Sequence, residues 1–317
     1  MDSLQAFLDF AIGVIGPVVV LLSFGYGLFR TGLLTDDFVE RGSRLIFNFA
    51  LPALLFINIS QADLNSLIDP KSVAIGISGT LLVFVVSFVM VSVGVKEVAD
   101  KGVLVQGIFR SNMGIIGLAY CAKAYGPEGL AYGSVYMGCL TIVYNILSVA
   151  VLNIFQNQQT NFIKILKGIA SNPIILSIIA GLIFSVLHIP LPQIAHNSLS
   201  YFAQLTLPLA LLCTGAALRF SSLGEHWRLP LVGIMGKCFI YPLVIIFLAI
   251  QFGISGMPLG VIFLMAMSPT AAASYIMVRK IGGNHQLAAQ IIALSTVVSL
   301  PVTVIGYWIM LQVSNIN

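Results

Sequence analysis

The stretch Gln106-Gly-Ile-Phe-Arg110-Ser-Asn-Met-Gly114-Ile-Ile-Gly117 interrupts a long apolar segment with an arginine, a serine, two amides and three glycines. A second stretch, Met267-Ser-Pro-Thr270, interrupts another apolar segment nearer the C-terminus. Its proline removes a backbone hydrogen-bond donor and clashes with the preceding helical turn. An apolar segment broken in its middle is typical of the discontinuous membrane helices that line a binding site.

The composition of the whole chain agrees with a membrane setting. Of its 317 residues, 58% are apolar and only 8% are charged, against about 25% charged in a soluble domain. So few charges cannot cover a body of this size in water, so membrane lipid must contact most of its surface. No basic cluster with interleaved aromatic residues occurs, which argues against a nucleic-acid partner.

Apolar runs long enough to cross a bilayer define the expected architecture. A hydrocarbon core about 30 Å thick requires roughly 20 apolar helical residues. We therefore expect an all-α polytopic membrane protein, with a single transporter domain over residues 1–317 and ten transmembrane helices. The expected spans lie near 8–29, 42–59, 72–95, 103–122, 130–154, 173–188, 199–218, 230–252, 259–278 and 287–311.

The basic residues between these spans predict their orientation. Eleven of the 15 lysines and arginines fall in the first, third, fifth, seventh and ninth connections, and only two fall in the others. Basic connections stay in the cytoplasm, so we expect a multi-pass protein of the cytoplasmic (inner) membrane with both termini outside the cytoplasm. The two remaining basic residues, Arg110 and Lys237, lie within expected spans.

The two halves of the chain resemble each other weakly. A shift of 156 residues aligns three pairs of amide or helix-breaking residues: Asn48 with Gln204, Pro52 with Pro208, and Asn145 with Pro301. A shift of 157 residues lays 110–114 over 267–271. Residues 1–155 and 156–317 would thus form two five-span repeats. An odd number of spans inverts the second repeat, as in many secondary transporters, with the fourth and ninth helices broken and crossing.

The broken spans supply the candidate binding residues. Freed backbone groups and positively polarised helix N-termini can bind an anion at mid-membrane. We expect the substrate site to include Arg110, Ser111, Asn112, Gly114, Asn145, Lys237, Ser268, Pro269 and Thr270.

The two cations within spans bear on the substrate's charge. No acidic residue lies in a span interior except Asp9, near an outer edge. An excess of positive charge favours an anionic substrate, provided that Arg110 and Lys237 face the site rather than snorkel to the membrane surface. Asn48, Asn145 and Gln204 are single amides in apolar helices, and their alternative role is to form hydrogen bonds between helices.

Other chemistries have little support in the sequence. The four histidines share no helix face, so we expect no metal site, and nothing suggests a cofactor. No zinc-protease motif, serine elbow or pair of intramembrane aspartates is present. A membrane-embedded enzyme is therefore less well supported than a carrier. A structural or receptor-like membrane protein is a further alternative, but it would not require broken helices.

Three motifs together resemble the auxin efflux carrier family, including its bacterial malonate-permease-like members: Asn48-x-x-Leu51-Pro52, Arg110-Ser111-Asn112-x-Gly114-x-x-Gly117 and Ser268-Pro269-Thr270-Ala271. The resemblance implies a fold of the bile acid/sodium symporter type, with the broken helices crossing at the substrate site. It also implies an elevator mechanism, in which spans 3–5 and 8–10 move against spans 1, 2, 6 and 7, and a homodimer.

The chain departs from the plant carriers of that family in two places. Gly114 lies in a region where those carriers have a proline, and the long cytoplasmic loop is replaced by the short connection 155–172. The expected function is a secondary carrier of small organic anions, with carboxylates favoured. The alternatives are an anion channel, a sodium-coupled symporter of the bile-acid type and, last, an enzyme. Coupling to protons or to sodium stays open.

Overall fold

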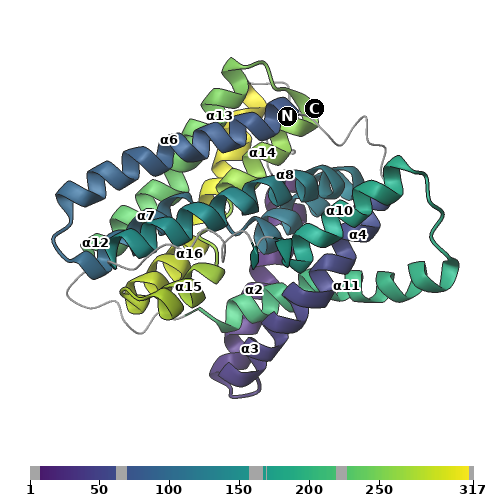
Figure 1. Ribbon diagram of the computed structural model, residues 1–317, viewed down its shortest axis with the longest axis horizontal. Helices are drawn as coiled ribbons and strands as arrows, with labels where there is room; N and C mark the ends of the chain where they lie inside the picture. The colour runs from purple at the N-terminus through teal and green to yellow at the C-terminus, as the bar shows by residue number, and fades with distance from the viewer. Residues whose placement is uncertain (1–7, 62–69, 157–166, 169, 219–226, 314–317) are drawn as a thin grey trace.

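The structure of the chain is a computed structural model that describes residues 8–61, 70–156, 167–168, 170–218 and 227–313. Within these ranges the ordered elements are helices, and one isolated backbone bridge joins two segments between helices (Figure 1). The expectation of an all-helical protein is confirmed.

Seven helical segments of the described chain are long and apolar enough to cross a membrane, which confirms a multi-pass membrane protein. They span Leu8–Arg30, Asp36–Ser60, Pro70–Gly94, Met113–Phe155, Gln193–Ala216, Arg228–Gln251 and His285–Met310. Two shorter apolar helices are α10 (Pro173–Val186) and α14 (Gly256–Met267). The sequence predicts ten spans. The two numbers differ by three because the fourth and ninth predicted spans are divided into short helices and the sixth corresponds to α10, which has only 14 residues.

The division of the fourth span also changes its boundary with the fifth. Helix α7 (Val98–Phe109) ends at the polar stretch, and the chain resumes as the π-helical turn η3 (Met113–Gly117) followed by α8 (Leu118–Phe155). Gly126 breaks α8 with φ 60° and ψ −149°, directly before Pro127. A positive φ at this point is accessible to glycine without steric cost, so the chain turns there between two membrane helices.

Wide π-helical turns precede prolines at three places. The turns η1 (Ala11–Ile15), η2 (Ile46–Ala50) and η4 (Gly236–Ile240) lead into α2 (Gly16–Arg30), α4 (Leu51–Ser60) and α13 (Tyr241–Gln251), whose second residue is proline. A proline ring clashes with the carbonyl four residues earlier, and one extra residue in the turn relieves this clash. Asn48 and Lys237 lie in two of these turns.

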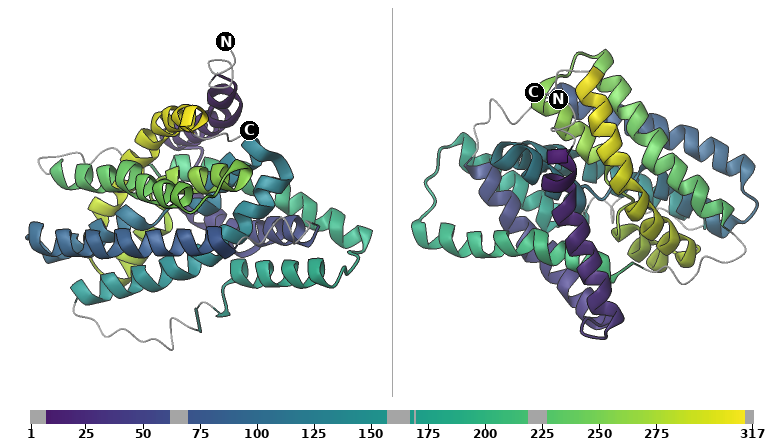
Figure 2. Two further views of the ribbon diagram at one scale, coloured as in Figure 1. Left: turned by 90° about the horizontal axis from the view of Figure 1, so that it is seen from above. Right: turned by 180° about the vertical axis from the view of Figure 1, so that it is seen from behind.

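The helices pack as two groups (Figures 1 and 2). The first group contains α2, α4, α10 and two further helices, α3 (Asp36–Leu45) and α11 (Gln193–Ala216). The second contains α7, α8, α13, α14 and the helices α6 (Pro70–Gly94), α12 (Arg228–Met235), α15 (Ala273–Ile281) and α16 (His285–Val313). Helix α8 contacts α4 and α10, η1 contacts α8 and α16, and α11 contacts η3. These few elements join the two groups.

Glycines allow the closest helix contact of the first group, between α2 and α11. A Cβ atom at Gly215 would overlap the backbone carbonyl of Leu22, and one at Gly25 would overlap the carbonyl of Leu212. Small residues let membrane helices approach to backbone contact, where van der Waals packing stabilises the pair. Two reciprocal glycines therefore fix how α2 crosses α11.

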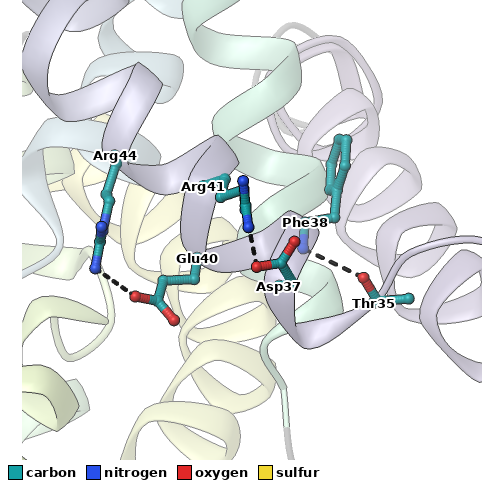
Figure 3. A network of polar contacts seen from close by, with 6 residues as sticks. All are labelled: Thr35, Asp37, Phe38, Glu40, Arg41 and Arg44. Carbon is teal, nitrogen blue, oxygen red and sulfur yellow. Dashed lines mark hydrogen bonds and ion pairs between the residues drawn. The ribbon is translucent and has the colours of Figure 1, made fainter.

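Helix α3 carries the charged end of the second long segment (Figure 3). Arg41 donates to Asp37 at 2.8 Å and Arg44 to Glu40 at 2.6 Å, and the Thr35 hydroxyl caps the helix by accepting from the Phe38 amide. These side chains are exposed, so each pair contributes at most about 0.5 kcal/mol. They keep this helix end in water. Both chain termini and the basic residues Lys164 and Arg219 lie outside the described residues.

We predict that Gly215→Ala lowers the melting temperature of the detergent-purified protein, because the added methyl group forces α2 and α11 apart at a cost of roughly 1–3 kcal/mol. The matched control is Gly27→Ala in α2, where an added Cβ meets no atom within 4 Å. This control should be neutral or stabilising, since alanine favours helices over glycine. Equal melting temperatures for the two variants would contradict the packing role of Gly215.

Candidate functional site

The two broken helices meet through their backbones at the centre of the second group. The Asn112 amide donates to the Pro269 carbonyl at 2.7 Å, and the Ala271 amide donates to the Arg110 carbonyl at 3.0 Å. Ser111 and Thr270 form the antiparallel bridge between these bonds. Both segments lack helical partners here, and unpaired backbone groups are costly inside a membrane protein. Each break therefore provides hydrogen-bond partners for backbone groups of the other.

Side chains of the second break reinforce this crossing. The buried Thr270 hydroxyl donates to the Gly107 carbonyl at 2.7 Å, and its amide donates to the Ser295 hydroxyl at 3.1 Å. The Ser268 hydroxyl returns to the Leu264 carbonyl of its own helix at 3.0 Å. Ser268 and Thr270, predicted as substrate ligands, thus bond to protein groups that the break leaves without partners.

A cavity of about 400 Å³ lies beside the crossing, between the two groups of helices. A cavity of this size suits a small ligand. Its walls come from η2 and α4, the two breaks, α8 and the starts of α10 and α15. The lining includes Asn48, Leu51, Arg110, Ser111, Asn112, Gly114, Thr141, Tyr144, Asn145, Asn172, Pro173, Ala271 and Ala273.

Arg110 is the cation of this cavity. One terminal nitrogen, Nη1, donates to the Tyr144 carbonyl at 3.2 Å and to the Ser148 hydroxyl at 3.0 Å, and Nη2 donates to Asn145 Oδ1 at 2.9 Å. Its side chain is 7% exposed and its Nε has no partner among the described residues. The guanidinium therefore bonds to α8 instead of snorkelling to the membrane surface, and a donor is left over.

Lys237 lies on the other side of the crossing. Its ammonium donates to the Ser111 hydroxyl and, at 3.1 Å, to the Ala266 carbonyl, and it lies 4.1 Å from the ring centroid of Tyr241. The side chain is fully buried and does not line the cavity. Ser111 stands between this ammonium and the cavity, so the geometry does not suit a direct substrate contact by Lys237.

The other predicted residues divide between the cavity and the outer surface. Asn48 and Gly114 line the cavity, and Gly114 lies close to Met137 and Leu51. Pro52 begins α4 directly after the wide turn η2. The remaining three, Gln204, Pro208 and Pro301, are exposed and do not line the cavity.

Sequence reasoning missed the tyrosines of the site. The hydroxyls of Tyr144 and Tyr241 lie 2.6 Å apart, and Tyr241 also pairs with the Thr80 hydroxyl at 3.1 Å. Thr80, Tyr144 and Tyr241 come from three different helices, so no short motif contains them. Their polar tips in apolar segments were the available signal. Among the described residues, no three His, Cys, Asp or Glu side chains gather as metal ligands.

Comparison with known proteins gives a family. The model of the membrane transport protein family matches residues 10–307. A protein of Methanothermobacter thermautotrophicus, described as an uncharacterized transporter, is 25% identical over 286 residues, which cover 89% of this chain and 93% of that protein. The uncharacterized transporter YfdV of Escherichia coli K12 is 36% identical over 56 residues, 18% of each chain.

We predict that Arg110→Gln weakens the binding of small carboxylates by about 2 kcal/mol, or roughly thirtyfold in Kd, because it removes a charge-assisted contact. Thermal-shift titrations with acetate, malonate and succinate at constant ionic strength measure this loss. Arg110→Lys is the matched variant, since it keeps the charge and loses the planar fork that α8 holds. Unchanged carboxylate affinity in Arg110→Gln would remove Arg110 from the binding site.

Proposed function

Since the chain belongs to the membrane transport protein family, we propose that it is a secondary carrier of small organic anions, with carboxylates as the favoured class. The observation that carries this proposal is the Arg110 guanidinium, which lines the cavity without a carboxylate partner among the described residues. A buried charge is costly unless it is paired. A bound anion would provide the missing negative charge.

The polar groups around Arg110 fit an anion of a few carbon atoms. The Asn112 side chain makes no hydrogen bond within the described part of the chain and lines the same cavity. Helix α15 begins at Ala273 on the cavity wall, and its N-terminus adds partial positive charge. Asn145 bonds to Arg110 and would hold the guanidinium in place rather than contact the anion first.

An elevator mechanism is our proposal for the movement. In the proposed ten-span inverted repeat, the group built on α7, α8 and α14 would be the mobile part, and the group built on α2, α4 and α11 would be the scaffold. The cavity between the groups supports this division, because sliding one group past the other would carry the crossing and its anion across the membrane.

The present cavity would face the cytoplasm. Part of its wall, Gly168, Ser171 and Asn172, belongs to the end of the connection that the basic residues assign to the cytoplasmic side, and Pro173 and Ile174 begin the helix that follows. We therefore propose an inward-facing state, in the inner membrane, with both termini outside the cytoplasm. A second copy of the chain is the proposed partner.

An anion channel is the main competing function. A channel needs a continuous polar pore. The cavity is instead bordered by the crossing, where buried backbone bonds join Asn112 to Pro269 and Ala271 to Arg110. A sodium-coupled symporter is the second alternative. Its uptake would depend on a sodium gradient, which distinguishes it from an anion channel.

We predict that Asn112→Ala reduces carboxylate uptake into proteoliposomes by about tenfold, as expected for the loss of one hydrogen bond to a charged group. The crossing should survive, because it uses the Asn112 backbone amide. The control is Asn58→Ala, which removes an amide that, among the described residues, bonds to the Leu54 carbonyl of its own helix. Wild-type uptake by Asn112→Ala would exclude this side chain from the site.

A cysteine at Thr141 should distinguish a carrier from a channel. Thr141 lines the cavity, so in a background without the native cysteines an impermeant maleimide should label Thr141→Cys from one membrane side at a time. A saturating carboxylate should change the rate of labelling. Rapid labelling from both sides under one condition would contradict alternating access and favour a channel.

A further inference from the structure

Lys237 is a fully buried cation that the proposed anion site does not use. It lies in the wide turn η4, and its two hydrogen-bond acceptors come from the two broken helices: the hydroxyl of Ser111 and the carbonyl of Ala266. The third ammonium hydrogen is left for the face of the Tyr241 ring. One ammonium therefore bonds to both broken helices, and it does so without lining the cavity.

No acidic side chain faces this ammonium within the described chain. The titratable groups around it are Cys238 on its own turn, Tyr241 on α13, Tyr120 and Tyr144 on α8, and Arg110 at the end of α7. Helix α16 contributes the hydroxyl of Ser295, which bonds at the crossing and does not titrate. The ammonium thus lacks a permanent negative partner.

Lysine and arginine respond differently to this situation. Arginine stays protonated in proteins, whereas a buried lysine can exist as a neutral amine. Burial penalises the ammonium, and its contacts with Ser111, Ala266 and Tyr241 stabilise it. A neutral amine has one lone pair and two hydrogens, so it would lose part of this bonding. The protonation of Lys237 thereby changes how firmly the two breaks are tied together.

Ser111 connects Lys237 to the cavity, because its hydroxyl accepts from Lys237 and the residue also lines the cavity wall. A proton can pass in one concerted step. The ammonium transfers a proton to Ser111 Oγ, while the Ser111 hydroxyl hydrogen moves to a water or a substrate carboxylate in the cavity. Lys237 becomes neutral, Ser111 is regenerated, and the acceptor gains one proton.

We propose that Lys237 is the coupling site of the carrier and takes one proton across the membrane together with each organic anion. This inference rests on the proposed function. An anion beside Arg110 and Ser111 stabilises the ammonium across the serine, and the ammonium stabilises the anion in return, since such linkage is reciprocal. The anion-loaded carrier is therefore also the protonated carrier.

The same geometry argues for a proton rather than sodium. A sodium site at this place would need the oxygen atoms of Ser111 and Ala266, and the lysine ammonium already bonds to both. The Lys237 ammonium therefore occupies the oxygen ligands that a sodium ion would need at this place. Uptake driven by the pH gradient and independent of sodium is the expected behaviour.

The test uses proteoliposomes with valinomycin and equal potassium on both sides, which holds the membrane potential near zero. The probe is radiolabelled malonate or succinate, whichever stabilises the wild-type protein more. Acetate is not used here, because acetic acid crosses lipid without a carrier and accumulates in an alkaline lumen. With the lumen one pH unit more alkaline, one proton per anion should accumulate the probe about tenfold. Pyranine in the lumen should report acidification as the probe enters, beyond that seen in protein-free liposomes.

Three variants complete the experiment. Lys237→Met removes the proton carrier and Lys237→Arg fixes the charge, so both should exchange labelled for unlabelled carboxylate and lose the accumulation driven by pH. Lys123→Met, which removes an exposed lysine, should behave as the wild type. Size-exclusion profiles show whether each variant is folded. If Lys237→Met does not fold, Lys237→Arg still tests the inference, because it retains the contacts of a cation.

Two results would overturn the inference: wild-type protein that exchanges the probe without responding to the pH gradient, or a folded Lys237→Met that still accumulates it about tenfold. Accumulation that follows a sodium gradient at equal pH would overturn it as well. Failure of the proposed function looks different, since the wild type would then exchange neither malonate nor succinate under any gradient.

Discussion

Backbone hydrogen bonding in an apolar solvent is the constraint on which this structure depends. Helices α7 and α14 both end inside the molecule, and each leaves amides and carbonyls that lipid cannot satisfy. The two breaks solve this problem by bonding to each other, through Asn112 with Pro269 and Ala271 with Arg110. The crossing thus avoids the free-energy cost of unpaired backbone groups in two interrupted helices. It also creates polar surface inside a membrane protein.

Two buried cations lie on opposite sides of this crossing and differ in what they can do. Arg110 keeps its charge, bonds to α8 and lines the cavity, which suits the binding of an anion. Lys237 is sealed behind Ser111 and is the cation that can give up a proton. Ser111 bonds to Lys237 and follows Arg110 directly in the chain. Anion binding beside Arg110 and protonation of Lys237 would therefore both affect this one residue.

Prolines and glycines set the packing around this centre. The wide turns before Pro52 and Pro242 place Asn48 at the cavity and Lys237 at the crossing. Gly25 and Gly215 bring α2 and α11 into backbone contact within the other group of helices. The helices therefore contact one another more within each group than between the two groups.

The sequence by itself determined the membrane class, the two broken segments and the polar centre of the cavity, Arg110, Ser111 and Asn112, because hydropathy, proline and intramembrane charge act locally along the chain. It identified fewer than half of the residues that line the cavity in the described structure. The family resemblance, which the family match confirms, came from the same motifs. Only the tertiary structure decided that Ser268 and Thr270 bond within the crossing, that Lys237 lies behind it, and that Tyr144 and Tyr241 meet. Each of these depends on which helices are neighbours in space, and a single sequence does not record that.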